Sequence, residues 1–78
     1  MRRIELTNRL VKCLSRKLRE ANGRARQFTP KELAQEIDGA YAGSIGHVAE
    51  EVVSILRGDG WNIRYDRIGN PKRFLINP

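Results

Sequence analysis

Residues 29–78 read TPKELAQEIDGAYAGSIGHVAEEVVSILRGDGWNIRYDRIGNPKRFLINP. The segment opens with Thr29 and Pro30 and has Glu32 three positions after the threonine. Threonine caps a helix start, proline fits the first helical position, and a glutamate at the third completes a capping box. The apolar spacing that follows predicts a helix over residues 30–38, ending near Asp38-Gly39.

A second helix is predicted over residues 44–57, after a short glycine-bearing turn over residues 40–43. Ser44 is a suitable N-cap, and Gly58-Asp59-Gly60 supplies a stop. One arc of the helical wheel is apolar, which predicts a buried face. Its members are Ile45, Val48, Ala49, Val52, Ile55 and Leu56, whereas Val53 lies beside the polar arc.

After Gly60 the apolar period changes from that of a helix to two. Trp61, Ile63 and Tyr65 alternate with polar residues, and residues 74 and 76 repeat the pattern. Because Gly69-Asn70-Pro71 permits a chain reversal, a β-hairpin is predicted over residues 61–76.

The segment before residue 29 is basic and amphipathic. Leucines at positions 6, 10, 14 and 18 follow helical spacing, and Asn22-Gly23 supplies a stop, so a helix is predicted over residues 4–21. The connector that follows predicts a short extended piece over residues 26–28.

The order helix, short strand, helix, turn, helix and hairpin resembles the winged helix-turn-helix superfamily. The resemblance covers nearly the whole chain and rests on residues 28–34, 44–56 and 60–76. It implies an α+β fold: one domain over residues 1–78, with a three-helix core and a C-terminal β-hairpin wing. Most members bind double-stranded DNA, so the expected function is that of a small transcriptional regulator or chromatin-associated factor.

Length and charge agree with one small nucleic-acid-binding domain. Fifteen Lys and Arg residues against nine Asp and Glu give a net charge of +6, which favours polyanionic partners. The charge is uneven, because residues 1–26 carry +7, residues 27–60 carry −4 and residues 61–78 carry +3. No apolar run approaches the roughly 18 residues of a membrane span, so we expect a cytoplasmic or nucleoid-associated protein without a membrane partner.

The sequence offers little material for catalysis or metal binding. Cys13 is the single cysteine and His47 the single histidine, and no glycine-rich phosphate loop is present. Carboxylate pairs with a recognisable acid–base spacing are also missing. We therefore expect neither an enzyme nor a bound cofactor or metal.

The resemblance implies two groups of DNA-contacting residues. The start of the second helix of a helix-turn-helix enters the major groove, which here places Ser44, Gly46, His47 and Glu50 at the bases. His47 could donate to a base or phosphate, and Glu50 could accept from a cytosine amino group. The hairpin would contact phosphates or the minor groove through Arg64, Arg67, Asn70, Lys72 and Arg73.

The acidic middle segment leaves two interpretations open. A helix that enters a groove usually carries Arg, Lys, Asn or Gln, whereas this one carries Glu50 and Glu51. The helix could still enter the groove, with affinity supplied by the basic ends. Alternatively, its acidic face binds a protein, and the chain is an interaction module of a larger nucleic-acid-processing assembly. A homodimer through the first helix, and RNA in place of DNA, also remain open.

Overall fold

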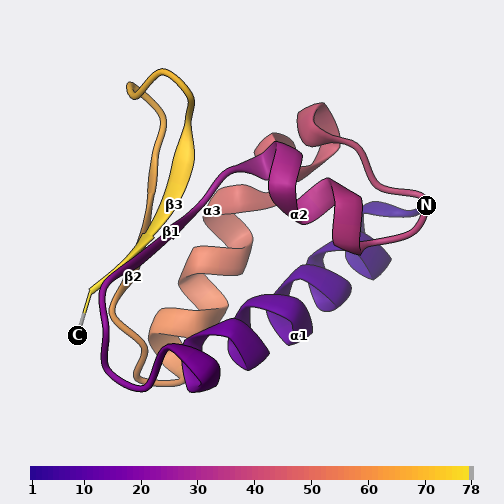
Figure 1. Ribbon diagram of the computed structural model, residues 1–78. Helices are drawn as coiled ribbons and strands as arrows, with labels where there is room; N and C mark the ends of the chain where they lie inside the picture. The colour runs from indigo at the N-terminus through magenta and orange to yellow at the C-terminus, as the bar shows by residue number, and fades with distance from the viewer. Residues whose placement is uncertain (78) are drawn as a thin grey trace.

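The computed structural model describes residues 1–77, which form three helices and a three-stranded antiparallel sheet (Figure 1). The predicted α+β class and the short strand over residues 26–28 are confirmed. The helices are α1 (Arg3–Ala21), α2 (Pro30–Glu36) and α3 (Ala42–Gly58). The strands are β1 (Arg26–Phe28), β2 (Ile63–Asp66) and β3 (Arg73–Ile76).

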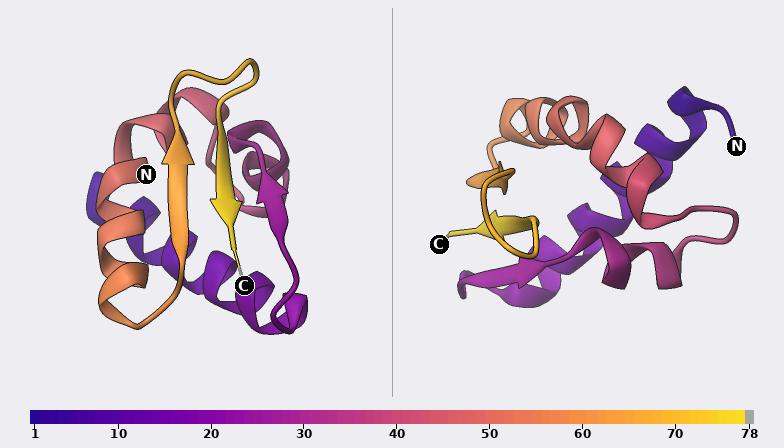
Figure 2. Two further views of the ribbon diagram at one scale, coloured as in Figure 1. Left: turned by 90° about the vertical axis from the view of Figure 1, so that its left-hand side faces the viewer. Right: turned by 90° about the horizontal axis from the view of Figure 1, so that it is seen from above.

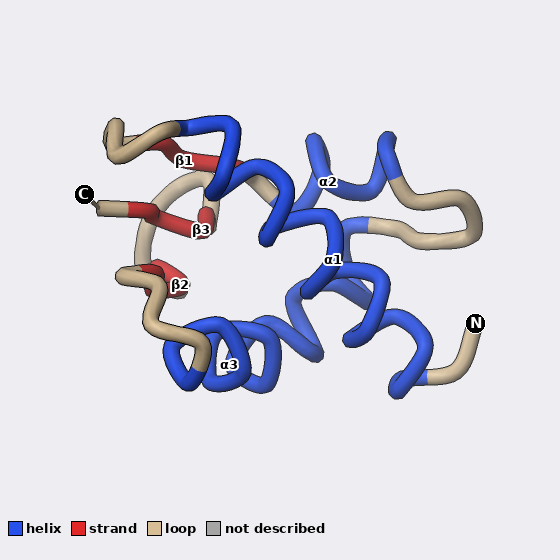
Figure 3. The backbone as a smooth tube through the Cα atoms, turned by 90° about the horizontal axis from the view of Figure 1, so that it is seen from below, coloured by secondary structure: helices blue, strands red, loops and turns tan. Residues whose placement is uncertain are grey.

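The sheet has the order β1-β3-β2, so the last strand lies at its centre. Phe74 of β3 is opposite Phe28 on one side and Tyr65 on the other. The rings of Tyr65 and Phe74 are tilted, with centroids 4.7 Å apart. The helices gather on one face of the sheet, and the other face is open (Figures 2 and 3).

The core forms between the helices and this inner face. The predicted leucine stripe of α1 is buried, as expected from its helical spacing. It packs in one cluster with the apolar residues of α3 and of the sheet. The largest fully buried side chains are Phe74, Leu10, Leu14, Leu33, Ile45, Leu56 and Ile63.

Two residues of α3 differ from their predicted burial. Ile55 is 43% exposed, whereas Val53 is buried. On the helical wheel Val53 shares a flank with Gly46, and a Cβ on Gly46 would lie 3.7 Å from the Tyr65 hydroxyl. The sheet therefore covers this flank of α3, and the buried arc is rotated away from Ile55.

The start of α3 corrects a second prediction. The helix begins at Ala42, two residues before the predicted start, with Tyr41 in the cap position. Ser44 therefore lies in the first turn and is not the N-cap. Its Oγ accepts from the Tyr41 N–H at 3.3 Å and donates to the Tyr41 carbonyl at 2.7 Å. The serine hydroxyl thus bonds both backbone groups of Tyr41 within the first turn of α3.

The other predicted boundaries shift by one or two residues. Helix α2 ends at Glu36 and not at residue 38, because Ile37 adopts an extended backbone and turns its side chain into the core. Helix α1 starts one residue earlier and α3 ends one residue later than predicted. The hairpin strands begin at Ile63, because Trp61 and Asn62 still belong to the connection from α3.

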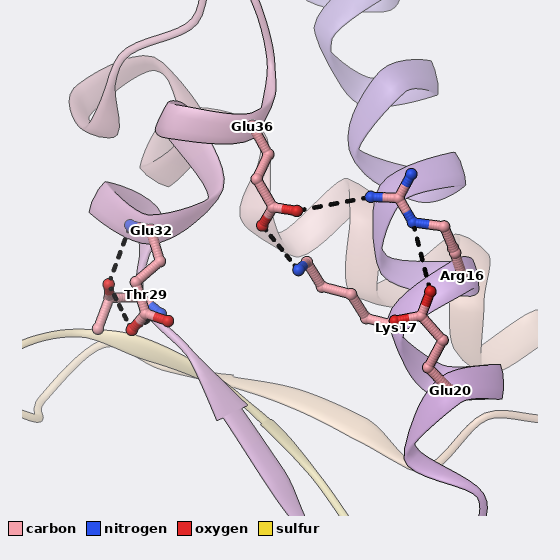
Figure 4. A network of polar contacts seen from close by, with 6 residues as sticks. All are labelled: Arg16, Lys17, Glu20, Thr29, Glu32 and Glu36. Carbon is pink, nitrogen blue, oxygen red and sulfur yellow. Dashed lines mark hydrogen bonds and ion pairs between the residues drawn. The ribbon is translucent and has the colours of Figure 1, made fainter.

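Two sets of polar contacts fix α2 (Figure 4). The predicted capping box is confirmed: the Glu32 N–H donates to Thr29 Oγ1 at 3.2 Å, and the Thr29 N–H donates to Glu32 Oε1 at 3.4 Å. At the other end, the Glu36 carboxylate pairs with Lys17 at 2.7 Å and Arg16 at 3.5 Å. These pairs join α2 to α1. None of the helices in residues 1–77 is long and apolar enough to cross a membrane.

The capping box gives a first prediction. Thr29→Ala should lower the free energy of unfolding by about 1 kcal/mol, because an N–H at the start of α2 loses its partner. The thermal midpoint should fall by roughly 4–8 °C. Thr29→Ser keeps the hydroxyl and should stay near wild type in the same melting experiment. Equal midpoints for the alanine and serine variants would contradict a stabilising cap.

Candidate nucleic-acid interface

An open groove of about 540 Å³ lies where the starts of α2 and α3 face the β2–β3 loop. These three segments come together at one end of the molecule (Figure 1). The start of α2 and the loop contribute polar side chains, and the start of α3 contributes His47 together with residues that have small side chains. The lining includes Lys31, Gly46, His47, Tyr65, Arg67 and Lys72.

The groove lining is basic. Lys31 comes from α2, and Arg67 and Lys72 come from the loop between β2 and β3. Among the described residues that line the groove, none is acidic. Ala42 and Gly43 also line it, so the first turn of α3 presents its backbone without large side chains. The arrangement suits a polyanion that approaches a helix start.

The two glutamates of α3 are paired with arginines. Arg67 Nε lies 2.9 Å from Glu50 Oε1. Arg3 Nε donates to Glu51 Oε1 at 3.1 Å, and the Arg3 guanidinium also donates to the His47 carbonyl at 3.2 Å. Arginines from both basic ends therefore lie beside the two glutamates of α3 and reduce its local negative charge.

These pairs are exposed, with more than half of the side chains of Arg67 and Glu50 accessible to solvent. Exposed ion pairs contribute about 0–1 kcal/mol, because water screens the attraction and both side chains lose freedom. A phosphate could therefore displace Glu50 from Arg67 at small cost.

The structure brings together some of the predicted site residues and separates others. The groove is lined by Gly46, His47, Arg67 and Lys72. Glu50 is not one of the lining residues, but it pairs with Arg67, which is. Asn70 is exposed in the loop. The hydroxyl of Ser44 is held by the Tyr41 backbone, as described above.

Arg64 and Arg73 lie on the open face of the sheet, away from the groove. They alternate along their strands with Ile63 and Phe74, which point into the core. Arg73 donates to Gln27 Oε1 at 2.9 Å and to the Pro71 carbonyl at 3.2 Å. Its guanidinium thus ties the hairpin to β1.

Lys31 and Tyr65 are among the groove residues that are absent from the sequence-based set. Lys31 follows the capping threonine and proline. Its place in the first turn of α2 is the sequence feature that could have predicted its position at the groove. Tyr65 was predicted as a core residue from its alternation, and its ring does pack on Phe74. It also lines the groove, and the Arg67 guanidinium lies 5.7 Å from its ring centre. Burial raises the pKa of Tyr65, so its hydroxyl remains a hydrogen-bond donor at neutral pH.

The loop between β2 and β3 is held by Asp66. One of its carboxylate oxygens accepts from the N–H groups of Ile68 and Gly69, both at 3.0 Å. These two bonds favour the charged carboxylate and lower the pKa of Asp66 below its ordinary value of 3.8. Gly69 is enclosed: a Cβ there would lie 2.7 Å from Asp66 Oδ2 and 3.1 Å from the Pro71 carbonyl.

A pH titration should report these bonds. Because the pKa of Asp66 is lowered on folding, the bonds persist above 3.8 and are lost as the pH falls through the folded-state pKa. The amide resonances of Ile68 and Gly69 should therefore move with a midpoint below pH 3.8. Asp66→Asn should remove this movement. A midpoint at or above 3.8 in the wild-type spectra would contradict the contact.

Comparison of the chain with protein-family models, with curated proteins and with solved structures gave no match. The function is therefore inferred from the geometry and charge of the groove.

Proposed function

We propose that this chain is a winged-helix protein that binds duplex DNA, with the start of α3 in the major groove and the β2–β3 loop as the wing. One observation carries the proposal. The starts of two helices and the hairpin loop converge on one groove, whose described lining holds Lys31, Arg67 and Lys72 and no acidic side chain. Helix-turn-helix proteins place the start of their second helix at the bases and support it with backbone contacts from neighbouring segments.

The groove residues differ in the part of the DNA that each could contact. Lys31 and Lys72 line the groove from α2 and from the hairpin loop, where each could neutralise a phosphate. The exposed His47 and the small residues Gly43 and Gly46 let base edges approach the first turns of α3. Arg67 would exchange Glu50 for a phosphate, and the released carboxylate could then accept from a cytosine amino group.

The protein-docking alternative depended on the acidic middle segment. Since Arg3 and Arg67 pair with Glu51 and Glu50, α3 offers a weaker acidic surface than its sequence indicates. This weakens the alternative. A homodimer through α1 stays a prediction: its leucine stripe packs inside the same chain, so a second chain would have to use its outer face, where Ile4 is 68% exposed.

The proposal is tested by a salt titration of binding to a labelled random duplex. The logarithm of the binding constant should fall linearly with the logarithm of the salt concentration, with a slope of about −0.9 for each phosphate neutralised. Lys31, Arg67 and Lys72 alone predict a slope near −3. An excess of structured RNA should compete poorly. If the duplex is not retained even at low salt, the proposal is wrong and the docking module becomes the better hypothesis.

A further inference from the structure

Ile68 is the most exposed large apolar residue of the described chain, at 97%. It lies in the loop between β2 and β3, directly after Arg67 and four residues before Lys72, both of which line the groove. The loop projects beyond the helices at the groove end of the molecule (Figures 1 and 2). A single exposed isoleucine is common on protein surfaces.

The backbone that carries Ile68 is fixed from both sides. Asp66 accepts from the Ile68 and Gly69 N–H groups, and Gly69 fits so closely against Asp66 and Pro71 that a methyl group would collide. A β-branched side chain also has few rotamers of its own. The loop thus presents an apolar side chain on a restrained backbone, so less conformational freedom would be lost on binding.

We propose that Ile68 is an apolar wedge that enters the minor groove of DNA and partly unstacks one base step. This inference rests on the proposed function and extends it to a residue that the charge argument does not include. Proteins that open and bend DNA from the minor groove insert apolar side chains, isoleucine among them, between base steps. The neighbouring cations Arg67 and Lys72 line the groove beside this loop, where they could meet the flanking phosphates.

Other partners fit the loop less well. A myristoyl chain gives only marginal membrane binding by itself, and an isoleucine side chain offers much less apolar surface. A protein hot spot usually places its anchor within a wider apolar contact area. The described part of the loop contains no other exposed large apolar side chain, and its charged residues are basic.

The test compares wild type, Ile68→Ala and Ile55→Ala on a duplex of roughly 30 base pairs with a flexible TA step and a fluorophore at each end. Ile55 is an exposed isoleucine near the far end of α3 and serves as the matched control. Wild type and Ile55→Ala should raise the end-to-end energy transfer and increase the fluorescence of a 2-aminopurine at the step. Ile68→Ala should lose both signals and bind about five- to tenfold more weakly, with an unchanged salt slope.

Failure of the wedge is separable from failure of DNA binding. If Ile68→Ala binds and bends the duplex like wild type, the wedge is wrong while the proposed function holds. If wild type does not bind the duplex at low salt, both are wrong. Capture by anionic vesicles that depends on Ile68, with DNA binding unaffected, would assign the side chain to a membrane and also overturn the wedge. Equal thermal midpoints for the three proteins will show that each is folded.

Discussion

Phe74→Ala is expected to lower the thermal midpoint of this domain by at least about 15 °C and to leave much of it unfolded at 37 °C. Phe74 is fully buried at the centre of the sheet, between Phe28 and Tyr65. Truncation of a buried phenylalanine costs about 3–5 kcal/mol, through lost apolar transfer and the cavity that remains. A chain of this size has roughly 4–12 kcal/mol of stability in total, so the loss is a large share.

Leu75→Ala is the matched control for this experiment. Leu75 is the next residue of the same strand, on the open face of the sheet, and is only partly buried. Its truncation should cost about 1 kcal/mol or less. Circular dichroism melts of both variants measure the difference. Similar midpoints for the two would show that the inner face of β3 does not close onto the helices.

The triple variant Lys31→Ala/Arg67→Ala/Lys72→Ala is expected to bind random duplex DNA on the order of 100-fold more weakly near physiological salt, because three phosphate contacts are lost. Its salt slope should flatten by about 3. The loss of Arg67 adds to the effect, since Glu50 is then left as an uncompensated negative charge beside the groove. Fluorescence anisotropy at several salt concentrations yields both quantities.

Lys12→Ala/Arg19→Ala/Arg24→Ala removes the same net charge elsewhere. These exposed residues lie on α1 and the connector after it, and none of them lines the groove. The control should therefore keep most of the affinity and of the salt slope. If the two triple variants lose equal affinity, the chain binds DNA through its overall charge, and the groove is not the interface.

The capping box shows what the sequence could predict and where it stopped. Thr29 and Glu32 satisfy each other locally, so the start of α2 followed from residue types alone. The start of α3 did not, because the Ser44 hydroxyl can cap a helix that starts after it or close the first turn of one that starts before it. Ala42 and Gly43 allow either choice. Only the packing of Ile45 and the rest of α3 on the core selects between them.

The candidate interface was predictable in part for a similar reason. His47, Arg67 and Lys72 followed from their places on the expected helix and hairpin, and the structure places them around one groove. The pairing of Arg3 with Glu51 joins residues 48 positions apart, and it depends on how α1 crosses α3. A count of charges by segment could not show that glutamates of the acidic middle pair with arginines of the two ends. The same holds for Lys31, whose neighbours in space come from α3 and the hairpin loop.

The position of β3 also governs when the domain can complete its fold on the ribosome. Both β1 and β2 pair only with β3 among the described strands, so no ladder can form until residue 76 has left the exit tunnel. The helices can form earlier, but Phe28 and Tyr65 then lack Phe74, which lies between them in the folded sheet. A nascent chain that stops before residue 73 would lack the whole sheet, and not merely one strand, which leaves it an obvious target for cellular proteases.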